Sequence, residues 1–137
     1  MNLVLDSSVT LAFVYPEEAT PAVLEVFRQV VADGAWVTAL WRLEVANVLE
    51  MGVRRGRTDT AFRNSALRDL ALLPIRTDPE TDAHAWGETL RIAEKHKLTI
   101  YDATYLELAK RLALPLATLD VELRAAAKSE KLQLLGI

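Results

Sequence analysis

The chain opens with the stretch LVLDSS, residues 3–8, in which three apolar residues stop at an aspartate and two serines. Such a run predicts a short buried strand that leads into the N-terminus of a helix. A second stretch, LATLD at residues 116–120, repeats this arrangement near the other end of the chain. Between the two, most apolar residues recur at helical spacing. Strands that alternate with helices predict a three-layer α/β/α sandwich around a mostly parallel central sheet.

Apolar periodicity and turn residues also give bounds for the expected elements. We expect strands at residues 3–5, 36–38, 73–75, 116–119 and 132–137, and helices at residues 9–15, 20–32, 41–53, 60–72, 81–96, 103–112 and 121–128. In the helix at 81–96, we expect Trp86 and Leu90 to face the core. Trp41, in the helix at 41–53, could belong to the core or serve as an exposed stacking surface. No repeat or linker interrupts the pattern, so we expect one domain over residues 1–137.

The composition limits the kinds of site that the chain can build. Its 137 residues are 51% hydrophobic and 26% charged, which is typical of a globular domain. There is no cysteine, which excludes disulfides and thiolate metal sites. The two histidines, His84 and His96, are expected at the surface and lie too far apart to suggest a zinc site. Any metal would therefore have to be bound by oxygen.

The sequence also bears on location and on nucleic-acid binding. The N-terminus lacks the features of a signal peptide, and no stretch approaches the roughly 20 apolar residues that span a bilayer. We therefore expect a cytoplasmic protein with no membrane contact. The formal net charge of −3 argues against a large non-specific nucleic-acid surface. It does not argue against an enzyme that contacts one strand locally.

Four acidic residues follow strands or begin helices. Asp6, Asp102 and Asp120 lie at junctions that lead into helices, and Glu44 lies in the first turns of the helix after the second strand. Because the carboxyl ends of parallel strands meet at one edge of a sheet, we expect all four at that edge. Each aspartate alone could simply cap a helix, and Glu44 alone could be a solvated helix residue. However, apolar neighbours surround Glu44, and a carboxylate on a largely buried helix needs a partner.

Convergence of these acids predicts a bound cation. Two carboxylates about 5 Å apart repel each other by roughly 3 kcal/mol at an effective dielectric constant near 20. Mg²⁺ and Mn²⁺ prefer oxygen ligands, which agrees with a site made only of carboxylates. Such an ion activates a bound water for attack on phosphorus. Asn47, one helical turn from Glu44, is a candidate to support the ligands from outside.

The sequence resembles the PIN-domain nucleases, and among them the VapC-type toxins of toxin–antitoxin pairs, over nearly its whole length. The resemblance rests on LVLDSSVTLAFV, LWRLEVANVLE and LTIYDATYLELAKRLALPLATLD. It implies that Asp6, Glu44, Asp102 and Asp120 bind Mg²⁺ or Mn²⁺ and catalyse hydrolysis of RNA, with Ser8 and Thr118 in supporting positions. Residues 54–98 match no motif, and the role of Glu122 stays open.

The resemblance also implies protein partners. VapC-like proteins form homodimers and bind an antitoxin, so we expect both here, through apolar faces of the first two helices around Phe13, Val14, Tyr15, Val23 and Phe27. Arg54, Arg55 and Arg57 cluster in the turn after the Glu44 helix. They either contact RNA phosphates or belong to a solvated turn.

Two other functions fit parts of the sequence. An aspartate after the first strand also fits phosphoaspartate chemistry, but Asp6-Ser7-Ser8 lacks the second aspartate of the DxD pattern, and Lys110 and Lys128 belong to expected helices. A non-catalytic PIN-like interaction module is the other alternative, although all four acids are present. The sequence contains no GxxxxGK motif, which excludes a P-loop nucleotide site.

Overall fold

The computed structural model describes residues 2–137. Five strands and the helices between them follow one another in the order β1 (Leu3–Leu5), α1 (Ser7–Val14), η1 (Pro16–Glu18), α2 (Pro21–Asp33), β2 (Ala35–Val37), α3 (Trp41–Arg54), α4 (Thr60–Ala71), β3 (Ile75–Thr77), α5 (Thr81–His84), α6 (Glu88–His96), α7 (Ile100–Leu112), β4 (Leu116–Ala117), α8 (Val121–Ser129) and β5 (Leu134–Leu135). No helix among these residues is long and apolar enough to cross a membrane.

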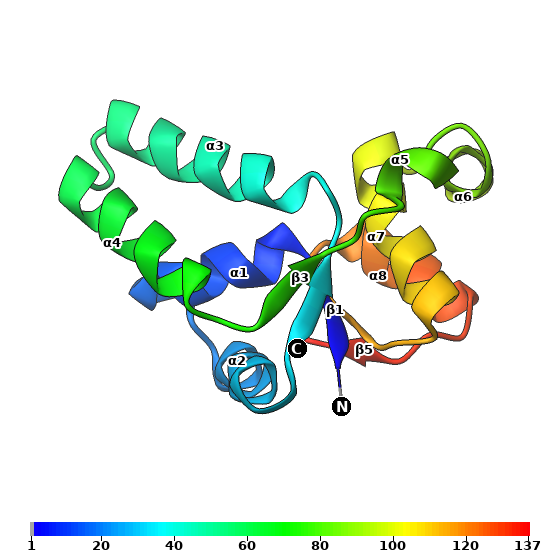
Figure 1. Ribbon diagram of the computed structural model, residues 1–137, viewed down its shortest axis with the longest axis horizontal. Helices are drawn as coiled ribbons and strands as arrows, with labels where there is room; N and C mark the ends of the chain where they lie inside the picture. The colour runs from blue at the N-terminus through cyan, green and yellow to red at the C-terminus, as the bar shows by residue number, and fades with distance from the viewer. Residues whose placement is uncertain (1) are drawn as a thin grey trace.

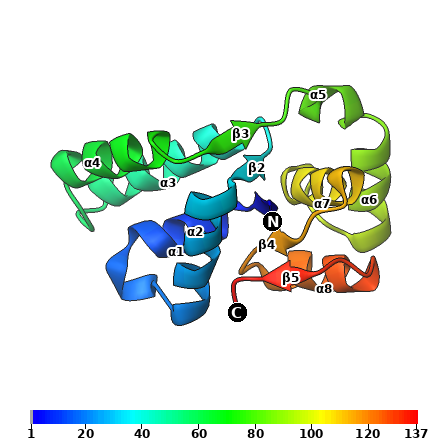
Figure 2. The same ribbon diagram turned by 60° about the horizontal axis from the view of Figure 1, so that its bottom comes forward.

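The strands form one sheet in the order β3-β2-β1-β4-β5, and every neighbouring pair is parallel. Figure 1 shows α1 to α4 on one side of the sheet and α5 to α8 on the other, and Figure 2 shows the same separation after rotation. The expected three-layer α/β/α sandwich with a parallel sheet is therefore confirmed.

Alternation along β1 divides the buried residues between the two faces. Leu3 and Leu5 pack with α1, α2, α3 and α4, whereas Val4 packs with α6, α7 and α8. All three side chains are fully buried. Successive side chains of a strand point to opposite faces, so this short apolar run contributes to both cores at once.

The order of the strands changes direction at β1. The chain moves from β1 to β2 and β3 on one side, and then crosses over to β4 and β5 on the other. Parallel sheets bind ligands in the crevice beyond the strand ends at such a reversal. The residues that follow β1 and β4 lie there, and they include Asp6 and Asp120.

Two of the expected helices have different bounds in the structure. The helix expected at 81–96 is divided into α5 and α6 around Trp86 and Gly87. The break changes the helical phase, so Trp86 is 94% exposed and Leu90 is also exposed, and the prediction that they face the core is wrong. Helix α7 begins at Ile100 rather than 103 because Thr99 caps it, its hydroxyl accepting from the backbone N–H of Asp102.

Three side-chain environments also differ from the expectation. Tyr15, Val23 and Phe27 are buried within the chain, so they offer no free surface to a partner. His96 is mostly covered and lies 2.7 Å from a carboxylate oxygen of Glu130, rather than standing free at the surface. Trp41, left undecided from the sequence, is buried and donates from Nε1 to the Thr10 hydroxyl, which joins α3 to α1.

Candidate active site

The Asp6 carboxylate is buried at the end of β1, where only 4% of the residue is exposed. Asp6 is the N-cap residue of α1, but its side chain does not cap the helix. Instead, its Oδ2 accepts hydrogen bonds from Ser8 at 2.6 Å and from Thr118 at 2.8 Å. Burial raises the pKa of the Asp6 carboxyl more than these hydroxyl groups lower it. No lysine or arginine among residues 2–137 forms an ion pair with it.

The loop after β4 connects Asp120 to the same place. The Thr118 hydroxyl, which donates to Asp6, also accepts from the backbone N–H of Asp120 at 3.1 Å. The Oδ1 atom of Asp120 accepts from the backbone N–H of Leu123 and so caps α8. The capping alternative is therefore realised for Asp120. A carboxylate has further lone pairs, so capping leaves capacity for another ligand.

Glu44 approaches from the first turn of α3. Its Oε1 atom accepts a hydrogen bond of 2.6 Å from the phenol of Tyr105, a fully buried residue of α7. Burial raises the pKa of Glu44, the Tyr105 hydrogen bond lowers it, and the charges of Asp6 and Asp102 raise it further. Tyr105 was not predicted from the sequence, although it follows Asp102 by three residues and so lies on the same face of one helix.

Asp102 lies in the first turn of α7. Because Thr99 caps this helix, the Asp102 side chain is not needed as a cap. Burial, followed by the charges of Asp120 and Asp6, raises the pKa of the Asp102 carboxyl to about 6. Glu122, whose role the sequence left open, is exposed and adds a smaller effect in the same direction.

Charges among the four acids thus raise the pKa values of Asp6, Glu44 and Asp102, but the acids do not form a ready ligand cluster. No group of three Asp, Glu or His side chains among residues 2–137 is close enough to hold a metal ion as placed. Hydroxyl, phenol and backbone donors occupy oxygens of Asp6, Glu44 and Asp120. Binding an ion would therefore require these side chains to turn towards one another.

The donor set suits a hard divalent cation. All candidate ligands are carboxylate oxygens, and their mutual repulsion is what such a cation would relieve. The buried Asp6 carboxylate has hydroxyl partners but no cationic one among the described residues. Of the supporting candidates, Ser8 and Thr118 donate to Asp6 directly, whereas Asn47 forms no side-chain hydrogen bond with an acid among residues 2–137 and lines the hollows beside Glu44 and beside Arg55.

Comparisons with known proteins give the family of this chain. A model of the PIN domain matches residues 3–129. Ribonuclease VapC3 of Pyrobaculum aerophilum is 31% identical to this chain over 123 residues, which cover 90% of this chain and 92% of that protein. The chain belongs to the PIN-domain family. Exonuclease VapC9 of the same organism is 37% identical over 86 residues, or 62% of this PIN-domain chain and 61% of that protein.

Solved structures show the same fold. The Pyrobaculum aerophilum protein PAE2754 superposes with a TM-score of 0.71 at 26% identity, covering 98% of this PIN domain and 83% of that chain. FitAcB from Neisseria gonorrhoeae has a TM-score of 0.67 at 17% identity, covering 98% and 96%. VapBC2 from Rickettsia felis, bound to a promoter DNA fragment, has a TM-score of 0.65 at 13% identity, covering 98% and 97%. The last two resemble this chain in fold alone.

The three arginines at the end of α3 and just beyond it differ in their surroundings in this PIN domain. Arg57 lines a hollow with Ser8 and Asp120, and it lines a neighbouring hollow with Arg55. Its guanidinium lies 3.5 Å from the ring centre of Tyr15 and binds Glu17 and Glu18. Arg54 lines neither hollow and pairs with Glu50. Arg55 and Arg57, but not Arg54, therefore border the surface that leads to the acids.

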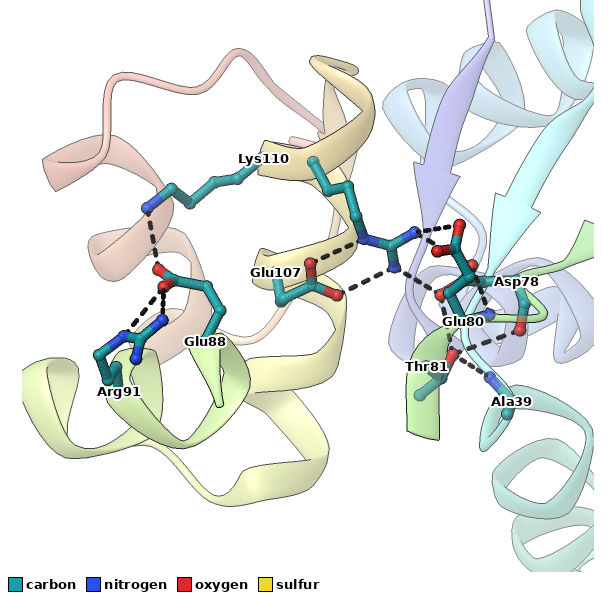
Figure 3. Close-up of polar contacts among 9 residues, drawn as sticks. Ala39, Asp78, Glu80, Thr81, Glu88, Arg91, Glu107 and Lys110 are labelled. Atoms are coloured by element: carbon teal, nitrogen blue, oxygen red, sulfur yellow. Dashed lines mark hydrogen bonds and ion pairs between the residues drawn. The ribbon is translucent and has the colours of Figure 1, made fainter. Parts of the chain in front are cut away.

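A buried ion network, which was not predicted from the sequence, joins the elements that carry Glu44 and Asp102. Arg111 of α7 binds Glu107 at 2.8 Å and Asp78, just after β3, at 2.6 Å. Asp78 in turn accepts from the Thr81 hydroxyl, whose oxygen accepts from the backbone N–H of Ala39. Figure 3 shows Glu107, Asp78, Thr81 and Ala39 in this chain of contacts. The network thereby links α7 to the loop that starts α3.

Proposed function

We propose that this chain is a ribonuclease that depends on Mg²⁺ or Mn²⁺ and cleaves RNA internally, as the toxin of a toxin–antitoxin pair in the cytoplasm. The observation that best supports the proposal is the buried Asp6 carboxylate, which lies within electrostatic reach of three other acids and has no cationic partner among the described residues. The name of the ribonuclease relative supports RNA as the substrate.

In this proposal, Asp6 and Asp102 are the principal metal ligands, and Glu44 and Asp120 bind through water or orient the nucleophile. A bound divalent ion would activate a water and neutralise charge on the phosphate. Ser8 and Thr118 hold the Asp6 carboxylate at the end of β1 by hydrogen bonds before an ion binds. Tyr105 holds Glu44 in the same way. Neither histidine is assigned a role as general base.

Cleavage of a labelled RNA by purified protein tests this function. We expect cleavage with Mg²⁺ or Mn²⁺, none in excess EDTA, and none by Asp6→Asn at any metal concentration. Asp69→Asn, at an exposed position on α4, is the matched control and should cleave normally. A closed circular RNA should also be cut, because internal cleavage needs no free end. Equal cleavage in EDTA would contradict metal dependence, and an intact circle would indicate exonuclease action.

Arg55 and Arg57 are proposed to contact phosphates of the bound strand. Charge reversal of both should weaken RNA binding and reduce its dependence on salt, because fewer counterions are released. Arg54, which lines neither of the two hollows that Arg57 borders, provides a comparison at the adjacent position. If the double reversal leaves both the affinity and its salt dependence unchanged, the turn is only a solvated connection.

Two protein partners belong to the same proposal, an antitoxin and a second copy of this chain. An apolar hollow between α1, α2 and α4, lined in part by Phe13, Val14, Val31 and Phe62, is a candidate surface for the antitoxin. The resemblance of the sequence to VapC-type toxins, together with the names of the relatives VapC3 and VapC9, supports an antitoxin partner. Light scattering at micromolar concentration tests the homodimer, which a strictly monomeric mass would contradict.

A further inference from the structure

We propose that a hollow between α3 and α7 binds one nucleobase of the substrate strand, with Tyr101 as its stacking surface. The inference rests on the proposed function, because it concerns the strand that the four acids would cleave. It adds a binding subsite and a role for residues that take no part in holding the ion.

The hollow adjoins the acids. It has a volume of about 280 Å³ and is lined by Leu40, Leu43, Glu44, Asn47 and Tyr101. Glu44 belongs both to this hollow and to the four acids, and Tyr101 directly precedes Asp102. Leu40, the first two turns of α3 and the first turn of α7 supply these residues, and the starts of the two helices face each other beyond the end of the sheet (Figure 1). A strand with its phosphate at the acids would therefore carry its neighbouring base past the hollow.

The lining suits a base in both shape and polarity. Tyr101 is 62% exposed and Leu43 is 69% exposed, although both are large and apolar. No ring contact pairs Tyr101 with another aromatic residue or a cation of the described chain. A base offers a planar face that stacks on such a ring regardless of sequence.

Asn47 provides the polar part of the hollow. Its amide both donates and accepts hydrogen bonds, and it forms none with the rest of residues 2–137 in this structure. Unpaired bases expose an edge that such an amide can recognise. A second protein chain could also cover exposed apolar residues, but a hollow that includes the charged Glu44 and an unpaired amide fits a base with a polar edge better than an apolar protein contact.

A scan with abasic nucleotides tests the inference. RNA substrates that each lack one base near the cleaved bond are compared with intact RNA, for the wild-type protein and Tyr101→Ala. The wild type should lose on the order of 10-fold in kcat/KM when one particular flanking base is missing. Tyr101→Ala should lose as much on intact RNA, and it should lose no more when that same base is removed. Tyr101→Phe keeps the ring and should behave like the wild type.

Controls separate this subsite from the function on which it rests. Leu24→Ala, at an exposed apolar position on α2, should keep the wild-type response to each abasic position. Tyr101→Ala could cleave intact RNA as well as the wild type does, or its loss of kcat/KM could add to the loss caused by every abasic position. Either result would contradict the base-binding subsite but not the proposed nuclease function. If Tyr101→Ala instead converts a dimer to a monomer, the hollow belongs to a protein interface and the proposal is overturned. Absence of any metal-dependent cleavage would overturn both.

Discussion

The four carboxylates of the site are held by different partners. Asp6 accepts from two hydroxyl groups, Glu44 from a phenol and Asp120 from a backbone N–H, while Asp102 lies in a helix turn capped by another residue. None of these partners carries a positive charge. The carboxylates are therefore positioned by neutral donors, and their charge is left for a cation to balance.

Replacing Tyr105 with phenylalanine tests how Glu44 is positioned. The change removes the donor 2.6 Å from Glu44 but keeps the ring that fills the core. A hydrogen bond to a charged group contributes about 1.5–3 kcal/mol, so we expect kcat to fall on the order of 10-fold with little change in KM. Steady-state kinetics measures both. If KM rises while kcat stays constant, Tyr105 supports substrate binding rather than the acid.

The raised pKa of Asp102 predicts how the stability of the protein depends on pH when metal is absent. Its pKa is raised from 3.8 to about 6, so the folded state binds this proton more tightly than the unfolded state does. The contribution to stability is therefore present below about pH 4 and is lost as the pH rises through 6. The Asp102→Asn substitution removes this loss of stability at high pH, because the asparagine side chain does not become charged.

Melting temperatures in EDTA measure this effect. The variant should match the wild type at pH 4 and exceed it at pH 7 by roughly 2–4 °C, for a contribution on the order of 1 kcal/mol after screening by solvent. A difference that does not vary with pH would contradict the raised pKa. A large loss of stability at every pH would instead assign Asp102 a structural role.

At the scale of elements, the network around Arg111 fixes α7 against β3 and the start of α3. Asp78 and Glu107 are each only 4% exposed, and both pair with this one guanidinium. Burial raises the pKa of Asp78, but Arg111 and neighbouring donors hold it below its usual value. The charged Asp78 carboxylate therefore depends on Arg111 for compensation, and the buried Glu107 pairs with the same guanidinium.

Arg111→Ala should destabilise the protein on the order of 3 kcal/mol, because it leaves the buried Asp78 and Glu107 side chains without a cationic partner. Arg28→Ala breaks an exposed ion pair with Glu25 on α2 and should cost about 0.5 kcal/mol or less. Denaturant unfolding of the two variants gives the comparison. Similar small losses in both would mean that water, rather than Arg111, compensates Asp78 and Glu107.

A helix or strand could be predicted from the sequence where the residues of that segment carry the apolar pattern themselves. The apolar run before Asp6 and the helical stripe of α2 carry their own periodicity, and both are found in the structure as expected. The division between α5 and α6 was missed because Trp86 and Leu90 fit a continuous helical pattern across Gly87. The i,i+4 pair of Glu107 and Arg111 is readable in the sequence, but its link to Asp78 depends on the fold.

The site, too, could be predicted only as far as local sequence patterns reach. All four acids were chosen from their places at strand ends and helix starts, and the parallel sheet brings them to one edge. Their assignment as metal ligands stays a prediction. The sequence did not reveal which donors occupy each carboxylate, because the contact between Tyr105 and Glu44 joins residues 61 positions apart.

At the scale of the whole molecule, helix α3 connects the proposed features along one surface. The hollow beside Tyr101 and the hollow beside Arg55 and Arg57 share Asn47 as a lining residue. Eleven residues separate Glu44 from Arg55, which corresponds to about 16 Å along a helix. A single strand lying along α3 would thus meet an aromatic ring, the acids and two arginines in turn.

The central claim is that acids from distant parts of the chain hold one catalytic site for divalent ions. A crystal of the protein soaked in Mn²⁺, with data collected at the manganese absorption edge, tests it most directly. We expect an anomalous peak within ligand distance of Asp6 and at least one of Glu44, Asp102 and Asp120, with the side chains turned towards it. An ordered crystal with no peak there at saturating Mn²⁺, or with a peak only at other carboxylates, would contradict the claim.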